Sequence, residues 1–243
     1  MGENKWRTFD GWPAPETTWT KYYLHSWEKL STRAHLPATQ TFVNEPPDAF
    51  VQMPPTQTNK IERLRYLTDP LAKDTLVVGP ISLTFWASLD QDDTNWIVIL
   101  KDVGPDVSVQ SARPGEREVP AGLPERELTR GWLKASRRAL DPERSKPWKP
   151  WHYLSPETIQ PLVPGEVNEY QVEILSTANL FRVGHRICLE ITSLDLAEGV
   201  AGETFAEYIP NHVCSSKTVL HKVFHNAEYP SHLLLPVIPG RKA

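Results

Sequence analysis

The sequence predicts an all-β fold, an antiparallel β-sandwich, from three observations. Apolar and polar residues alternate with a period of two in several runs after residue 74, as they do in strands with one buried face. Turns that contain Gly, Pro or Asp separate these runs, and no long helical period lies between them. The chain also contains 23 prolines in 243 residues, whereas an average protein has roughly 5%. Because proline cannot donate a backbone hydrogen bond, this composition disfavours long helices and fits many loops and strand ends.

The first 73 residues show little periodicity. The one strand-like run is 21–27, where Tyr23, His25 and Trp27 alternate with their neighbours. Residues 28–73 are polar and proline-rich and predict a long stretch with little secondary structure of its own. Such a stretch is uncommon inside a compact domain, so it indicates a segment that wraps a surface of this chain or of a partner. We therefore divide the chain into an extended linker or wrapping segment with one short strand (1–73) and a β-sandwich domain (74–243).

The predicted strands of the second part follow one another at short intervals. The clearest is 81–89, where Ile81 and Leu83 begin a row of apolar residues on one face. Residues 96–103 are apolar on both faces, as expected of a central strand. Residues 128–138 also fit a helix, and we favour a strand there. The remaining strands are predicted at 75–78, 169–177, 185–194, 218–224 and 232–237.

Composition and charge exclude several classes of function. The net charge is 26 − 30 = −4, which provides no global attraction for nucleic acid or anionic lipid. The polar N-terminus lacks the apolar stretch of a signal peptide, and no run approaches eighteen apolar residues. The two cysteines, Cys188 and Cys214, do not form a disulfide framework, which favours a reducing compartment and leaves a single bridge between them open. We expect a soluble, cytoplasmic protein with no nucleic-acid and no membrane partner.

Motifs for catalysis or metal binding are weak. The Gly-x-Ser-x-Gly elbow, which exposes the nucleophile of many serine hydrolases, is absent. His221 and His225 are four residues apart in a predicted strand, where they would be separated by about 13 Å, too far to share one metal. Asp90, Asp92 and Asp93 cluster in a turn, and aspartate is favoured in turns without calcium. We therefore predict no metal, no cofactor and no catalytic residue.

Residues 130–152 are locally basic and have aromatic residues between the charges. This combination is typical of sites for single-stranded nucleic acid and also of protein–protein contacts. The acidic net charge argues against nucleic acid, so we favour a surface that packs against another domain.

Several strings resemble the C-terminal domain of the Xaa-Pro dipeptidyl-peptidase and cocaine-esterase family, which includes the α-amino-acid ester hydrolases. The most specific strings are Leu-Lys-Ala-Ser-Arg (133–137), Pro-Gly-Glu-Val (164–167) and Phe-Arg-x-Gly-His-Arg-Ile-x-Leu-Glu-Ile (181–191). The N-terminal MGENKWRTFDGWPAPET and the C-terminal SHLLLPVIPG are also similar to that domain. The resemblance therefore covers nearly the whole chain.

This resemblance implies a jelly-roll β-sandwich of the galactose-binding-like type, with a long, mostly irregular N-terminal segment. In complete members it is appended to an α/β-hydrolase domain, whose Ser, Asp and His perform dipeptidyl-peptidase or acyl-ester hydrolysis. No position of this chain matches those three residues, so none is carried over and we expect the chain to be inactive alone. The implied partner is an α/β-hydrolase domain, in the same chain or in trans, and self-association into a homo-oligomer stays open. The expected domain-contact surface consists of Trp6, Trp12, Trp132, Trp148, Trp151 and His152.

The role expected from the resemblance is structural or substrate-shaping. The alternative is a stand-alone carbohydrate- or protein-binding β-sandwich module, since jelly rolls often carry lectin sites. In that case Trp86 or Trp96 would stack on a sugar ring from a solvent-lined groove. Burial of these tryptophans would favour the structural role.

Overall fold

The computed structural model describes residues 5–34, 45–54, 57–58, 60–105, 108–109, 119–120, 124–194 and 216–240. Within these ranges the chain forms β-strands, two short 3-10 helices and no α-helix, which confirms the all-β prediction. The strands are β1 (Thr18–His25), β2 (Lys29–Ser31), β3 (Asp48–Gln52), β4 (Arg63–Leu67), β5 (Thr75–Leu89), β6 (Asn95–Val103), β7 (Ser108–Val109), β8 (Val119–Pro120), β9 (Glu125–Lys134), β10 (Asn168–Phe181), β11 (Arg186–Thr192), β12 (Val219–Phe224) and β13 (His232–Ile238). The helices are η2 (Ala135–Arg137) and η3 (Pro156–Thr158).

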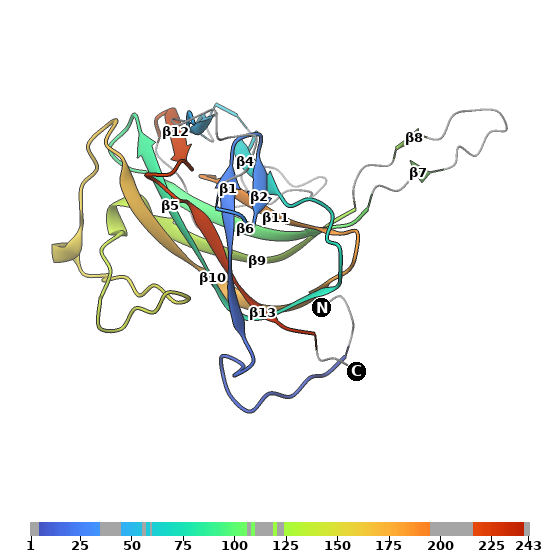
Figure 1. The fold of residues 1–243 in the computed structure, drawn as a ribbon. Coiled ribbons are helices and arrows are strands. Elements are labelled where there is room, and N and C mark those ends of the chain that lie inside the picture. Colours follow the sequence, from blue (N-terminus) through green and yellow to red (C-terminus); the bar gives the residue numbers. More distant parts are fainter. Residues whose placement is uncertain are drawn as a thin grey trace, which may run out of the picture.

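Nine of these strands close into a barrel (Figure 1). The order around the ring is β10–β9–β6–β11–β4–β2–β1–β13–β5, and β5 pairs again with β10. β12 and β3 extend the sheet beyond β5, while β7 and β8 form a separate two-stranded ribbon. All neighbours in the ring are antiparallel except β2 and β4, which are parallel.

The prediction of a jelly-roll β-sandwich is wrong, because the sheet is joined at both places where a sandwich would have open edges. One seam is the pairing of Lys29 in β2 with Leu67 in β4. The other is the pairing of Gly131 in β9 with Ile174 in β10. Each seam is a single residue pair. Along every strand, inward-facing and outward-facing side chains alternate in a closed barrel as they do in a sandwich. Periodicity alone therefore could not distinguish the two.

Gly131 is what allows the second seam to close. A Cβ atom on Gly131 would lie 2.2 Å from the backbone oxygen of Glu173, a distance that no side chain tolerates. Beside it, the Thr129 hydroxyl donates a 2.7 Å hydrogen bond to the backbone oxygen of Leu175. Glycine at this position thus permits the close approach of two backbones that a barrel seam requires.

The N-terminal segment is more ordered than expected. The run predicted at 21–27 forms β1, and β2, β3 and β4 also lie in the stretch predicted to be irregular. β1 pairs with β13 from Thr18–Val237 to Tyr23–His232, so the two ends of the chain share one sheet. The description of this segment as mostly irregular is therefore corrected. The division of the chain at residue 73 stays a prediction, because strand pairing does not say which segments fold on their own.

Strand β5 is one long strand, although two were predicted at 75–78 and 81–89. The chain does not break at Gly79 and Pro80, but both neighbouring strands shift register opposite them. Gly79 has a φ of 139°, and a Cβ there would lie 3.1 Å from the Cβ of Pro236 in β13. Proline removes one ladder hydrogen bond, so the strand bends here and continues.

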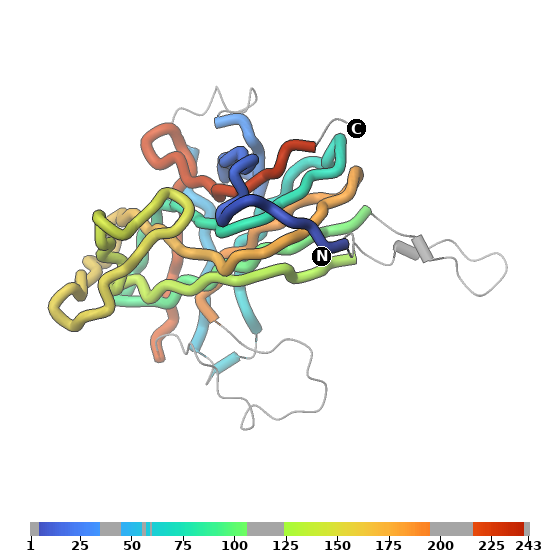
Figure 2. The backbone as a smooth tube through the Cα atoms, turned by 90° about the horizontal axis from the view of Figure 1, so that it is seen from below, coloured from blue at the N-terminus to red at the C-terminus, as the bar shows by residue number. Residues whose placement is uncertain are grey.

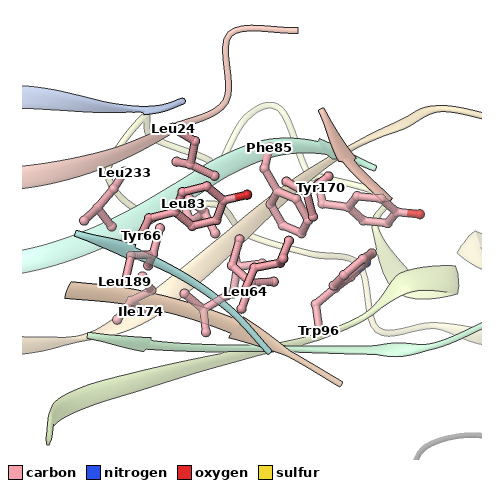
Figure 3. Close-up of a cluster of buried hydrophobic side chains, with 14 of the residues drawn as sticks. Leu24, Leu64, Tyr66, Leu83, Phe85, Trp96, Tyr170, Ile174, Leu189 and Leu233 are labelled. Carbon is pink, nitrogen blue, oxygen red and sulfur yellow. The ribbon is translucent and has the colours of Figure 1, made fainter. Parts of the chain in front are cut away.

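The core fills the inside of the barrel (Figure 3). Phe85 of β5 and Trp96 of β6 meet edge to face, with ring centroids 5.0 Å apart, and both are fully buried. Alternate residues of β5, β6, β10 and β11 supply the rest, including Tyr170, Ile174 and Leu189. Their burial supplies the main hydrophobic stabilisation of the fold.

Candidate functional site

The N-terminal segment before β1 carries two of the six residues of the expected contact surface. Trp6 is fully exposed and Trp12 is 62% exposed, whereas Ala14 nearby is buried. Figure 2 shows this segment in dark blue, passing across the strands close to the C-terminal end of β13. Large apolar side chains exposed in this way commonly mark the surface that contacts another protein or domain.

A cavity of about 510 Å³ lies beside Trp6, between residues 6–9 and the ends of β5, β10 and β13. Its lining combines apolar groups, such as Phe9 and Ile238, with charged ones. Arg182 donates a 3.0 Å hydrogen bond to Asp74 in its wall. The backbone N–H of Val183 and this arginine together lower the pKa of Asp74. The cavity therefore offers a polar and apolar hollow next to an exposed tryptophan.

Trp148 and Trp151 lie on the long loop between β9 and β10 and are engaged within the chain itself. Trp148 stacks on Trp19 of β1, with ring centroids 5.7 Å apart and an angle of 6° between the planes. The guanidinium of Arg144 lies 3.6 Å from the centre of the Trp151 ring, and the Lys149 ammonium lies 5.5 Å from it. These cation–π contacts pair two basic residues of this loop with one of its own aromatic rings.

Trp132 and His152 are both half-buried. Trp132 lies in β9 opposite Ile97 of β6, and His152 forms an isolated bridge with Leu140 in the loop. Burial lowers the pKa of His152, which favours its neutral form at neutral pH. The structure therefore groups Trp148, Trp151 and His152 on one loop and leaves Trp6 and Trp12 on the N-terminal segment. Trp19 connects the loop to β1, a link that the sequence analysis missed because it began the strand at residue 21.

A row of exposed apolar residues follows in the same loop. Leu154 is 80% exposed, Val163 is 60% exposed and Ile159 is 42% exposed. The loop that carries them is held by arginine side chains, since Arg137 and Arg138 donate hydrogen bonds to its backbone oxygens. The row is thus displayed by a well-anchored loop, which reduces the entropy cost of binding a partner. Sequence reasoning missed it because isolated apolar residues in a loop carry no periodicity.

Two groups of side chains resemble parts of a Ser-His-Asp triad. His185 Nδ1 lies 2.8 Å from Asp102, which also accepts a 3.1 Å hydrogen bond from Asn179. Elsewhere, the hydroxyl of Thr94 lies 2.9 Å from His221 Nε2 in the buried core. The first pair has no recorded hydroxyl partner on the imidazole, and the second has no recorded carboxylate. Within the described ranges, neither group therefore combines the three functions that a triad needs.

His221 and His225, the pair with metal-like spacing, contact different groups. His221 lies in β12 against Thr94, and burial lowers its pKa to about 3. His225 follows the end of β12 and lies between Glu45 and Asp48. The two imidazoles therefore contact different groups of side chains.

The aspartates of the turn after β5 also bind separate partners. Asp90 accepts a hydrogen bond from a backbone N–H of β12, and Asp92 forms a 3.1 Å ion pair with Lys217. Asp93 accepts hydrogen bonds from the backbone and the hydroxyl of Ser136. Among the described residues, no group of three or more His, Cys, Asp or Glu side chains is arranged to hold a metal.

The two tryptophans considered for sugar stacking lie in different surroundings. Trp96 is fully buried in the barrel core, so it has no free face for a ligand. Trp86 alternates with the core residue Phe85 along β5 and therefore faces out of the barrel, where it is half-buried. Its ring centroid lies 6.3 Å from that of Tyr229.

Cys188 is a free, buried thiol, and Cys214 lies outside the described residues. In the part of the chain that the structure describes, no helix has the length and apolar character needed to cross a membrane.

Comparison with known proteins places this geometry in a family context. Residues 1–234 match the family model described as the X-Pro dipeptidyl-peptidase C-terminal non-catalytic domain. The chain is 23% identical to the cocaine esterase of a Rhodococcus species in an alignment of 267 positions, gaps included, that covers 98% of this chain and 41% of that protein. It is 27% identical to a Mycobacterium bovis protein named as a serine esterase in an alignment of 214 positions, gaps included, that covers 80% of this chain and 31% of that protein.

Among solved structures, the chain superimposes on a CocE/NonD family hydrolase from Staphylococcus aureus with a TM-score of 0.69 and 21% identity. The match covers 96% of this chain and 39% of the other, and it establishes a shared fold. The chain therefore spans between 31% and 41% of the length of these similar proteins.

Proposed function

The chain belongs to the family of X-Pro dipeptidyl-peptidase C-terminal non-catalytic domains, and we propose that it packs against an α/β-hydrolase domain that performs acyl transfer. In this proposal the hydrolase domain contains the serine, histidine and aspartate of the reaction. The β-barrel supports that domain and shapes the approach of substrate to it. The observation that carries the proposal is the family match over residues 1–234.

Exposed tryptophans on the N-terminal segment support the proposed contact. Burying a tryptophan from water contributes on the order of 2 kcal/mol, and Trp6 and Trp12 gain little of this within the chain. We propose that both residues, together with the loop that carries Trp148, Trp151 and His152, face the hydrolase domain. Trp132, in β9 beside that loop, would support the same surface.

The proposed partner has the chemistry of an α/β-hydrolase domain, in the same polypeptide or in a separate one. We further propose that the complex works in a reducing compartment, because the described cysteine is free and buried. Self-association of the chain is a secondary expectation, for which the exposed row at Leu154, Ile159 and Val163 would be available.

Co-expression tests the contact. The chain is produced with α/β-hydrolase polypeptides of the source organism, and complex formation is measured by affinity pull-down and size-exclusion chromatography. The double variant Trp6→Ala and Trp12→Ala is expected to weaken the complex at least tenfold. Trp27→Ala is the matched control, since Trp27 is 90% exposed but lies in the hairpin between β1 and β2. Equal binding by all three proteins would reject the proposed surface.

A second candidate, binding of a carbohydrate, rests on Trp86. Its outward position beside Tyr229 leaves part of an indole available on the outer face of the barrel. If a sugar stacks there, Trp86→Ala abolishes binding on a glycan array, while Trp6→Ala leaves it unchanged. Absence of glycan binding by the unaltered chain removes this candidate.

A further inference from the structure

A short segment closes one end of the barrel without being part of its ring. We call residues 45–52 the strap; they include β3, whose hydrogen-bonded neighbour in the sheet is β12. Phe50 of the strap is buried, and its ring stacks on His221 with centroids 4.3 Å apart. His221 in turn meets the edge of the core residue Trp96 at 5.2 Å. The strap therefore covers the aromatic end of the core.

The strap is fastened differently at its two ends. At its C-terminal end, the Gln52 amide donates hydrogen bonds to the backbone oxygens of Met53 and Lys60 and accepts one from the Glu62 N–H. None of these bonds depends on a proton that titrates near neutral pH. At the other end, the side chains of Glu45 and Asp48 meet the imidazole of His225.

His225 lies between two carboxylates. Its Nδ1 is 3.2 Å from a Glu45 oxygen, and its Nε2 is 3.1 Å from an Asp48 oxygen. The same Asp48 oxygen accepts a 2.9 Å hydrogen bond from the Tyr66 hydroxyl of β4. The His225 side chain is fully buried, and that of Glu45 is 7% exposed. The cluster thus joins the strap, the end of β12 and a strand of the ring.

The two carboxylates around the ring favour the doubly protonated imidazole. Only the imidazolium can present an N–H to both carboxylates, whereas a neutral ring has one N–H and one lone pair. A neutral His225, whose side chain is fully buried, would therefore turn a ring nitrogen without a proton toward one of the carboxylates, of which Asp48 is 22% exposed. Unpaired buried charge is costly, so this state disfavours the closed strap.

The charged and titratable groups recorded around the cluster are few. Glu45 and Asp48, both in the strap, contact the imidazole directly. Tyr66 is linked to it through Asp48, and Glu28, in the hairpin after β1, contributes to the raised pKa of Tyr66. Burial alone would lower the pKa of His225, but Asp48 and Glu45 offset this and raise it above its ordinary value. His221, which also contacts the strap, does not titrate in this range because burial holds its pKa near 3.

We propose that His225 is a proton-dependent latch: its imidazolium holds the strap closed, and loss of the proton releases residues 45–50, including Phe50, and uncovers the aromatic end of the barrel. The latch is fully closed below the unfolded-state pKa of a histidine, about 6.5, and weakens as the pH rises through the higher folded-state value. The Gln52 end stays attached and acts as the hinge. The inference does not depend on the proposed hydrolase partner.

Hydrogen exchange on the full chain tests the latch. Amide protection, corrected for the intrinsic rate at each pH, is measured for β3 and for the ring strands β6 and β11 between pH 6 and pH 9. Protection of β3 is expected to fall severalfold over this range, and at pH 9 β3 is expected to exchange faster than β6 and β11. Protection of β3 that is constant with pH would overturn the proposal.

Two variants separate the latch from general loosening. His225→Gln, which cannot carry a charge, is expected to abolish the pH dependence of β3 protection. Gln52→Ala is the control, and it lowers β3 protection at every pH without changing the dependence. If His225→Gln does not fold, Glu45→Gln provides the test, because removing one carboxylate moves the midpoint to lower pH. An unchanged midpoint in Glu45→Gln, or a retained dependence in His225→Gln, contradicts the latch.

Discussion

The carboxylate of Glu28 accepts a 3.0 Å hydrogen bond from the backbone N–H of Arg65. The backbone oxygen of Glu28 also accepts a 2.9 Å hydrogen bond from the N–H of Leu67. Glu28 has a φ of 53°, an uncommon value for a residue other than glycine, and it follows Trp27 with a φ of 65°. This backbone turns both acceptors of Glu28 toward β4, so one residue fastens the seam between β2 and β4.

Removal of the Glu28 carboxylate should weaken this seam. Glu28→Ala leaves the Arg65 N–H without its acceptor and is expected to destabilise the chain by about 1 kcal/mol. Glu28→Gln keeps an oxygen at the same place and should lose less than half of that. Chemical denaturation with urea measures both. Equal destabilisation by the two variants would contradict the role of the side-chain oxygen.

The second seam depends on the missing side chain of Gly131. Gly131→Ala places a Cβ 2.2 Å from the Glu173 oxygen, and the strands must separate to make room. We expect a loss of about 3 kcal/mol or more, or failure to fold. Gly240→Ala is the control, because a Cβ there meets nothing within 4 Å. A Gly131→Ala variant with unaltered thermal stability would show that β9 and β10 do not approach this closely.

Buried His221 makes the fold sensitive to acid. Its pKa is about 3 in the folded chain, so between pH 6.5 and that value the unfolded chain binds one more proton than the folded chain. Stability therefore falls as the pH is lowered, by up to about 1.4 kcal/mol per pH unit for this group. His221→Gln should remove this contribution, measured as the difference between the two proteins at pH 6.5 and pH 5. Parallel curves for the two proteins would contradict it.

The thiol of Cys188 should be unreactive in the folded chain. Burial raises its pKa to about 12, and the thiolate is the reactive species. In a Cys214→Ser background, iodoacetamide at pH 8 is expected to label Cys188 only after denaturation. Mass spectrometry of the digested protein measures the modified fraction. Rapid labelling under native conditions would show that β11 opens or that the thiol is accessible.

The sequence predicts the long strands of this fold but not their closure. Runs such as 81–89 and 96–103 alternate or are uniformly apolar because they line a core, and this pattern is readable directly. Strands β2, β3 and β4 are only three to five residues long, and although Arg63–Tyr66 of β4 alternates, so short a run in a proline-rich stretch was not recognised as a strand. Closure of the barrel depends on Gly131 at one seam and on Glu28 at the other. Neither residue changes the alternation of apolar and polar residues along the strands. Pro80 predicted a strand end, but β5 continues through it, because the neighbouring strands β10 and β13 shift register there.

The candidate surface could be predicted only in part. Tryptophan content singled out Trp6, Trp12, Trp148 and Trp151, but the sequence does not show which rings are already engaged. Trp148 is covered by Trp19, and Trp151 by Arg144, through contacts that require the folded chain. Similarly, the expectation that no metal is shared by His221 and His225 followed from strand spacing, whereas the ion pairs of His225 could not be foreseen.

The most direct test of the proposed role is an activity assay of the purified chain. It is incubated with Xaa-Pro chromogenic amides and with aryl esters, with and without a serine-directed acylating inhibitor. If acyl transfer belongs to the partner hydrolase domain, the chain alone gives no turnover above the uncatalysed rate. Turnover that the inhibitor abolishes would place a reactive serine in this chain and contradict the account.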